Sequence, residues 1–271
     1  MFSKLLKHEF KNTYKETLFV SSGIMIVSLL ISVLFKTGFI PVLFKTGFIR
    51  IASFLLLSLV ALYIMAGAVI IINIVKSFHT KMFTDEGYLT MTLPVSVDGL
   101  LLSKIIVNLV WILATGIVFI LSLGLTINTI LGGNELFIFK SIITVIRDNP
   151  AGSIIYIIYF AISLLSFVLT LVLTLAILNI GKIKKYKLLF GIGIYYGLNF
   201  VLQLASTIFV IIPYAISVSA NGVSLEEFDY SDNFFSGLTF MSMNTLIVSI
   251  AGIIGFYFLS RYLIKNKLEL M

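Results

Sequence analysis

The stretch Ile51–Val75, IASFLLLSLVALYIMAGAVIIINIV, decides the fold class of this chain. It holds 25 residues without a single Asp, Glu, Lys, Arg or His. The hydrocarbon core of a bilayer is about 30 Å thick and a helix rises about 1.5 Å per residue, so about 20 apolar residues cross it. Apolar side chains cover every side of such a helix and do not alternate with polar ones, as they would in a strand of a membrane β-barrel. The stretch therefore predicts a transmembrane helix.

Five further runs of the same kind occur in the chain, and none contains an ionisable residue. With the first, the predicted spans are 18–35, 51–75, 105–131, 153–180, 188–212 and 240–259. The 271 residues are 59% hydrophobic and 11% charged, which excludes a soluble enzyme, a disordered tail and a nucleic-acid-binding domain. We therefore predict an all-α membrane protein in which residues 1–271 form a single transmembrane domain of six helices.

The basic residues indicate the orientation of the chain in the membrane. Of its 19 Lys and Arg residues, 14 fall in the N-terminal segment, the second and fourth loops and the C-terminus. The fifth loop has no basic residue and carries Glu226, Glu227, Asp229 and Asp232. Because basic residues near span ends are retained in the cytoplasm, both termini are predicted to be cytoplasmic.

The chain offers few means of covalent chemistry. It has no cysteine and only two histidines, His8 and His79. It contains no phosphate-binding Gly-rich loop, no nucleophile elbow and no pair of intramembrane carboxylates. We therefore expect no metal site, no cofactor and no enzymatic activity in this chain itself.

The N-terminal segment, residues 2–17, has the pattern of a basic amphipathic helix. Its lysines are spaced three, four and four apart and form one helical stripe, with apolar residues over much of the rest: Lys4, Lys7, Lys11 and Lys15. The pattern predicts an interfacial helix along the cytoplasmic surface, with its lysines toward lipid headgroups. The alternative is a positively charged anchor without a defined helix.

The cytoplasmic segment between the second and third spans, Lys76–Lys104, is longer than a simple turn requires. Its first half has the pattern of a short amphipathic helix with Phe78, Met82 and Phe83 on one side, ended by Asp85 and Glu86. Apolar and polar residues then alternate up to Pro94. Asp98 is placed to cap the next helix. The segment is either a docking element for a cytoplasmic partner or a solvated loop; its exposed apolar residues favour docking.

The fifth span carries a polar pair next to a small-residue pattern. Asn199 and Gln203 lie four residues apart on one helical face, and Gly193 and Gly197 precede them as a small-xxx-small pattern for close helix contact. The face lines a passage or contacts a second copy, or it packs inside the monomer with its amides bonded to neighbouring helices.

The first external loop contains the same eight residues twice: VLFKTGFI occurs at 33–40 and again at 42–49. Pro41 separates the two copies and disfavours one continuous helix. We expect a membrane-hugging hairpin rather than a substrate-binding device, because surface loops tolerate insertions without acquiring a role.

Together, the basic N-terminus FSKLLKHEFKNTYKE, the six spans and the segment FTDEGYLTMTLPVSVDGLLLSK, residues 83–104, resemble the permease subunits of bacterial ATP-binding-cassette (ABC) exporters of the six-helix type V class. The specific part is residues 83–104, and the spans extend the resemblance over the whole chain. Within the class, the chain looks most similar to permeases that export amphipathic peptides, such as the phenol-soluble modulin exporters.

The resemblance implies a multi-pass protein of the bacterial plasma membrane, a homodimer or a pair of different permeases, and two ATP-binding subunits that hold ATP and Mg. Residues 78–94 are then the coupling helix, with these contact residues: Phe78, Met82, Phe83, Asp85, Glu86, Tyr88, Leu89, Leu93 and Pro94. The passage lies between the two copies, near Asn199 and Gln203, and takes an apolar or amphipathic substrate such as a peptide. The alternative from another class is a membrane scaffold that recruits a soluble partner and transports nothing.

Overall fold

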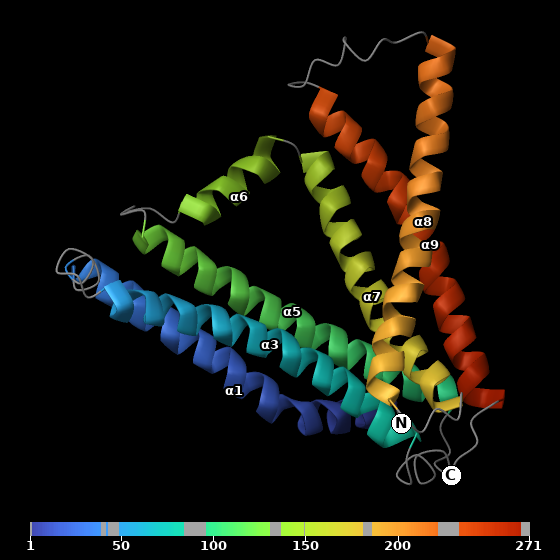
Figure 1. Ribbon diagram of the computed structural model, residues 1–271, viewed down its shortest axis with the longest axis horizontal. Coiled ribbons are helices and arrows are strands. Elements are labelled where there is room, and N and C mark those ends of the chain that lie inside the picture. The colour runs from blue at the N-terminus through green and yellow to red at the C-terminus, as the bar shows by residue number, and fades with distance from the viewer. Residues whose placement is uncertain are drawn as a thin grey trace. The chain divides into compact units, whose positions relative to one another are not determined.

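The computed structural model describes residues 2–38, 42, 49–83, 96–130, 137–148, 150–180, 186–221 and 233–266. These residues form seven α-helices and no strand (Figure 1). The helices are α1 (Phe2–Lys36), α3 (Ile49–Phe83), α5 (Val97–Ile130), α6 (Phe137–Asp148), α7 (Pro150–Ile180), α8 (Lys187–Asn221) and α9 (Asn233–Asn266). All except α6 are long and apolar enough to cross a membrane. The prediction of six helices long and apolar enough to span a membrane is confirmed, and each predicted span lies within one helix to within one residue.

The six long helices extend beyond the uncharged runs from which they were predicted. α1 and α3 hold 35 residues each, which corresponds to about 52 Å of helix, well over the thickness of a bilayer core. Neither Gly nor Pro interrupts residues 2–17 or 76–83, so the helices continue through their charged turns. The N-terminal segment is therefore helical, as predicted, but it is the first half of α1 and not a separate element.

The end of α1 shows why the helix stops where it does. Gly38 has a φ of 77°, the left-handed conformation that glycine adopts at little cost. Its backbone N–H donates to the carbonyl of Phe35 at 3.1 Å, and that of Thr37 donates to Val33 at 2.9 Å. These bonds satisfy the last carbonyls of the helix. The first copy of the repeated loop sequence thus ends α1, and most of the second copy lies outside the described residues.

The chain divides into two compact units. The first comprises Met1–Lys76 and Gly99–Asp148, and the second comprises Ser77–Asp98 and Asn149–Met271. In the first unit, α1, α3 and α5 lie side by side (Figure 1). Their apolar core forms around Val20, Ile24 and Ala66, with Val118 of α5 packed against it.

The second unit contains α7, α8 and α9, and each of these helices contacts the other two. α7 carries a continuous buried face: Val168, Leu169, Val172, Leu173 and Ala176. Two glycines allow close approach between helices. A Cβ at Gly191 would lie 2.9 Å from the Leu178 side chain, and one at Gly252 would lie 2.7 Å from that of Leu202.

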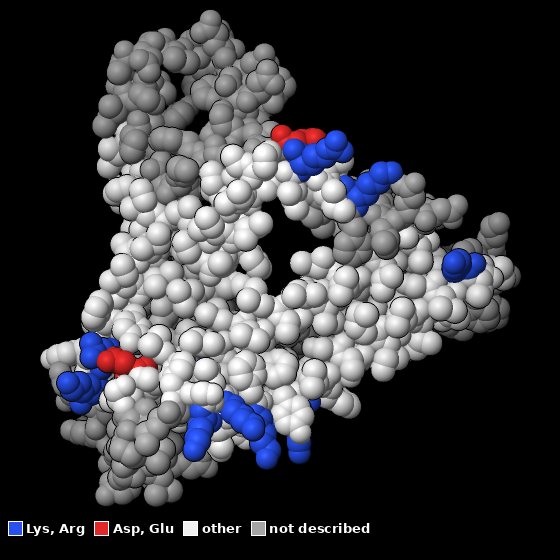
Figure 2. Space-filling view, turned by 180° about the vertical axis from the view of Figure 1, so that it is seen from behind, with Lys and Arg blue, Asp and Glu red and all other residues white. Residues whose placement is uncertain are grey.

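Charged side chains avoid the lengths of the spans. On the face seen in Figure 2, they gather along the N-terminal part of α1 and near helix ends, and the remaining described surface is uncharged. Large apolar side chains are exposed along every spanning helix. An exposed surface of this kind is expected where lipid, and not water, surrounds the protein.

Candidate functional site

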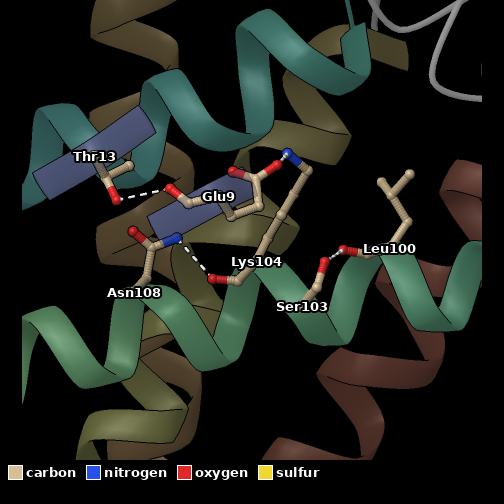
Figure 3. A network of polar contacts seen from close by, with 6 residues as sticks. All are labelled: Glu9, Thr13, Leu100, Ser103, Lys104 and Asn108. Carbon is tan, nitrogen blue, oxygen red and sulfur yellow. Dashed lines mark hydrogen bonds and ion pairs between the residues drawn. The ribbon is translucent and has the colours of Figure 1, made fainter. Parts of the chain in front are cut away.

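Among the described residues of the first unit, the most deeply buried charges are Glu9 of α1 and Lys104 of α5. The Lys104 Nζ lies 2.9 Å from the Glu9 Oε1, and the two side chains are only 2% and 10% exposed. Figure 3 shows Lys104 reaching from α5 to the carboxylate of Glu9. Two charges removed from water in this way are tolerated because each neutralises the other, and removal of either would leave the other uncompensated.

Hydrogen bonds surround this ion pair on both helices (Figure 3). The Asn108 amide donates to the backbone carbonyl of Lys104 at 2.9 Å, and the Thr13 hydroxyl donates to the carbonyl of Glu9 at 3.0 Å. The Ser103 hydroxyl donates to the carbonyl of Leu100 at 2.9 Å. The side chains around the pair are therefore bonded to the backbone of their own helices, which fixes their positions.

One turn further along, Trp111 and Asn73 join α1 to the two neighbouring helices. The Trp111 indole N–H donates to the Thr13 hydroxyl at 2.8 Å, and the Trp111 ring lies 6.0 Å from that of Phe10. The Asn73 amide of α3 donates to the Thr17 hydroxyl at 3.1 Å. Hydrogen bonds of this kind join helices in membrane proteins, where competing water is scarce.

A second ion pair joins α1 to α3. The Lys76 Nζ lies 2.9 Å from the Glu16 Oε1, and both side chains are more than half exposed, at 57% and 52%. A pair so well solvated adds about 1 kcal/mol or less to stability. It nevertheless places Lys76, at the start of residues 76–104, against α1, the helix whose Glu9 binds Lys104.

Small polar side chains continue along the inside of the first unit toward its other end. We call this set the polar seam; it comprises Glu9, Thr13, Thr17, Ser21, Ser28 and Ser32 of α1 and Lys104, Asn108, Thr115, Ser122 and Thr126 of α5. Tyr63 of α3 bonds to it through Ser122, at 2.8 Å between the two hydroxyl oxygens. All members except Thr13 are buried. Small hydroxyl residues allow helices to approach closely, and most of these hydroxyls bond to their own helix backbone.

A separate cluster lies in the second unit, at the start of α5. The Arg261 guanidinium of α9 lies 2.7 Å from one oxygen of Asp98, and the Tyr257 hydroxyl donates to the other at 3.1 Å. We expected Asp98 to cap the helix, but α5 begins at Val97 and Asp98 lies inside its first turn. Ser96 directly precedes the helix and has the residue type of an N-cap. Asp98 instead holds two side chains of α9.

The residues predicted to form the coupling helix are described only in part. Phe78, Met82 and Phe83 lie in the last turns of α3, in continuity with the second span and not in a short separate helix. Phe78 is completely buried, so its ring does not lie on the described surface of the protein. The others lie outside the described residues: Asp85, Glu86, Tyr88, Leu89, Leu93 and Pro94.

The predicted passage or dimer face lies on α8. A Cβ at Gly193 or Gly197 would have no other side chain within 4 Å. The Asn199 amide donates to the carbonyl of Tyr195 on its own helix at 2.9 Å, and Gln203 is exposed. Among the described residues of the second unit, this face is not used for close packing, which was the alternative explanation for the pattern.

The lysine stripe of α1 is exposed as predicted: Lys4, Lys7, Lys11 and Lys15. The opposite side of this part of α1 carries Glu9, Thr13 and Thr17, which bond to α5 and α3. That side therefore packs against protein, whereas an isolated interfacial helix would bury it in lipid.

Sequence reasoning missed the polar seam, although part of its signal was present. Hydroxyl residues recur on α1 at spacings of four and seven, the repeat of one helix face: Thr17, Ser21, Ser28 and Ser32. The pairing of Glu9 with Lys104 joins residues far apart in the sequence and had no local signal. Among the described residues, no group of three His, Cys, Asp or Glu side chains gathers to hold a metal ion.

A scan of the chain against protein-family models found no matching family, and searches of curated proteins and of solved structures also found no match. The resemblance to exporter permeases therefore rests on the residues of this chain.

Proposed function

We propose that this chain is the membrane-spanning permease subunit of an ATP-driven ABC exporter, which moves an apolar or amphipathic substrate, such as a peptide, out of a bacterial cell. Two ATP-binding subunits supply the energy and hold ATP and Mg. Residues 83–104 support the proposal through their resemblance to the corresponding permease segment.

The structural observation that supports the proposal is the attachment of residues 83–104 to α1. The last of these residues, Lys104, is the buried partner of Glu9 on α1. Just before the segment, Lys76 pairs with Glu16 on the same helix. An ATPase that docks on residues 78–94 and displaces them would therefore pull on α1 from both sides of the segment.

The segment also has an attachment in the second unit. Asp98, six residues before Lys104, holds Arg261 and Tyr257 of α9. Displacement of the segment would therefore move α1 in the first unit through Lys104 and Lys76, and α9 in the second unit through Asp98. Phe78 is buried, and Met82, Phe83 and the apolar residues up to Pro94 are the proposed contacts with the ATPase.

We place the passage, and the contact with a second copy of the chain, along α8. Most residues of its spanning part are not buried, and the exposed Gln203 amide would be costly to leave in lipid. The open glycines Gly193 and Gly197 allow another helix to approach closely. Uncharged walls of this kind suit an apolar or amphipathic substrate.

Two changes of charge in residues 83–104 test the coupling: one inserts a negative charge and the other removes one. We expect Leu93→Asp and Glu86→Ala to leave the protein in the membrane but to separate ATP hydrolysis from transport in reconstituted vesicles. Val42→Asp is the matched control, because it inserts the same charge at an exposed site in the external loop. Transport at the parent rate in both segment variants would refute the proposed coupling role.

A further inference from the structure

α6, Phe137–Asp148, is a helix that the proposed function does not use. It holds 12 residues, or about 18 Å of helix, which is too short to cross a bilayer core of about 30 Å. Three spanning helices precede it in the chain, so it lies on the side of the membrane opposite the termini. From the distribution of basic residues, that side is the outside.

The described side chains of α6 include a polar row, with Ile143 at its border and Ile146 further round the helix. Lys140, Thr144 and Arg147 follow each other at spacings of four and three, and all three are exposed. At 3.6 residues per turn, these three lie within about 60° of one another. Ile143 and Ile146 are 64% and 46% exposed. Ile146 lies about 120° round the helix from Lys140, and Ile143 lies between them, about 40° from Arg147. The exposed Asp148 lies about 80° from Lys140 in the other direction.

The connection to the next span keeps α6 at the membrane surface. α6 ends at Asp148 and α7 begins at Pro150, so the Cα atoms of these two residues are at most about 7 Å apart. Two exposed isoleucines on a helix held there would meet either water or lipid, and burial in lipid is the favourable environment for apolar side chains. The neighbouring cations Arg147 and Lys140 match the phosphates of lipid headgroups.

We propose that α6 is an interfacial helix that seats Ile146 in the outer leaflet, with Ile143 at the boundary with the headgroups, and binds lipid phosphate groups through Arg147, with Lys140 in the same row. The occupant of its apolar side is the lipid bilayer. This inference does not depend on the transport function, because it concerns only how the external side of the protein meets the membrane.

The absence of cysteine from the chain makes the test direct. Single-cysteine variants Ile146→Cys and Thr144→Cys of the full chain are spin-labelled and reconstituted in phosphatidylcholine vesicles containing phosphatidylglycerol. Accessibility to oxygen, which concentrates in lipid, is compared with accessibility to a water-soluble nickel chelate. We expect oxygen to be favoured at position 146 and the nickel chelate at position 144, an inversion between two sites two residues apart.

Two results would overturn the proposal. If the nickel chelate reaches both positions equally, α6 lies in water; if neither reagent reaches position 146, protein covers the apolar side. The phosphate contact is tested by adding Lys140→Gln and Arg147→Gln to the position-146 variant. We expect the deeper burial of the label in vesicles with phosphatidylglycerol, relative to phosphatidylcholine alone, to be lost, and its persistence would refute the contact.

Discussion

Replacing Lys104 by methionine should destabilise the first unit strongly. Its side chain is 2% exposed and that of Glu9 is 10% exposed, so the substitution leaves a carboxylate in the protein interior without its counter-charge. Breaking a buried ion pair on one side costs about 3 to 5 kcal/mol. Each 1.4 kcal/mol, roughly, changes an equilibrium constant tenfold, so the ratio of folded to unfolded protein should fall by a factor of about 100 to 10,000.

The only tryptophan of the chain, Trp111, reports on this region. Its indole N–H bonds to Thr13 and its ring lies near Phe10, so its fluorescence follows the separation of α5 from α1. Unfolding of the purified protein in mild detergent is measured by tryptophan emission during titration with a denaturing detergent. The matched control is Lys76→Met, whose exposed ion pair should change stability by about 1 kcal/mol or less.

A double variant separates lost charge pairing from lost packing. Glu9→Met combined with Lys104→Met removes both charges and keeps unbranched side chains of similar length. Because a buried ion pair can be replaced by apolar residues at little cost, the double variant should recover most of the lost stability. The reasoning is refuted if Lys104→Met unfolds at the parent detergent concentration, or if the two single losses simply add in the double variant.

Three further predictions concern packing between helices. Gly252→Val should lower the free energy of unfolding by about 1 to 3 kcal/mol, because its Cβ would meet Leu202 at 2.7 Å. Gly255→Val has open space around it and should lower that free energy less. Equal losses of stability in thermal unfolding would contradict the packing. Asn73→Leu should cost about 0.6 kcal/mol through loss of its bond to α1, and an unchanged unfolding midpoint would count against that bond. Gly197→Leu should leave the monomer folded but reduce cross-linking between copies, and undiminished cross-linking would exclude this face from the dimer.

The spans were predictable because their signal is local. A run such as 51–75 is apolar on all sides, and nothing except a membrane helix accommodates it in this chain. Their true ends were less predictable, because charged residues limit the apolar run but do not stop a helix. α3 therefore continues through Lys76 and His79 to Phe83.

The features that the sequence did not reveal depend on contacts between distant residues. Lys104 was counted as a marker of the cytoplasmic side, but its neutralisation by Glu9 requires α1 and α5 to lie side by side. Phe78 was assigned to a docking surface, and only the packed structure shows that it is completely buried. α6 escaped prediction because Lys140 and Arg147 interrupt its apolar residues within twelve positions.

The most direct test of the central claim is ATP hydrolysis by this chain purified together with candidate ABC ATP-binding subunits. We expect a stoichiometric complex whose hydrolysis rate responds to amphipathic peptides, and we expect Leu93→Asp to abolish that response. A chain that purifies without any ATP-binding subunit, and with no hydrolysis, would contradict the exporter proposal. It would favour instead a membrane scaffold whose cytoplasmic segment recruits another soluble partner.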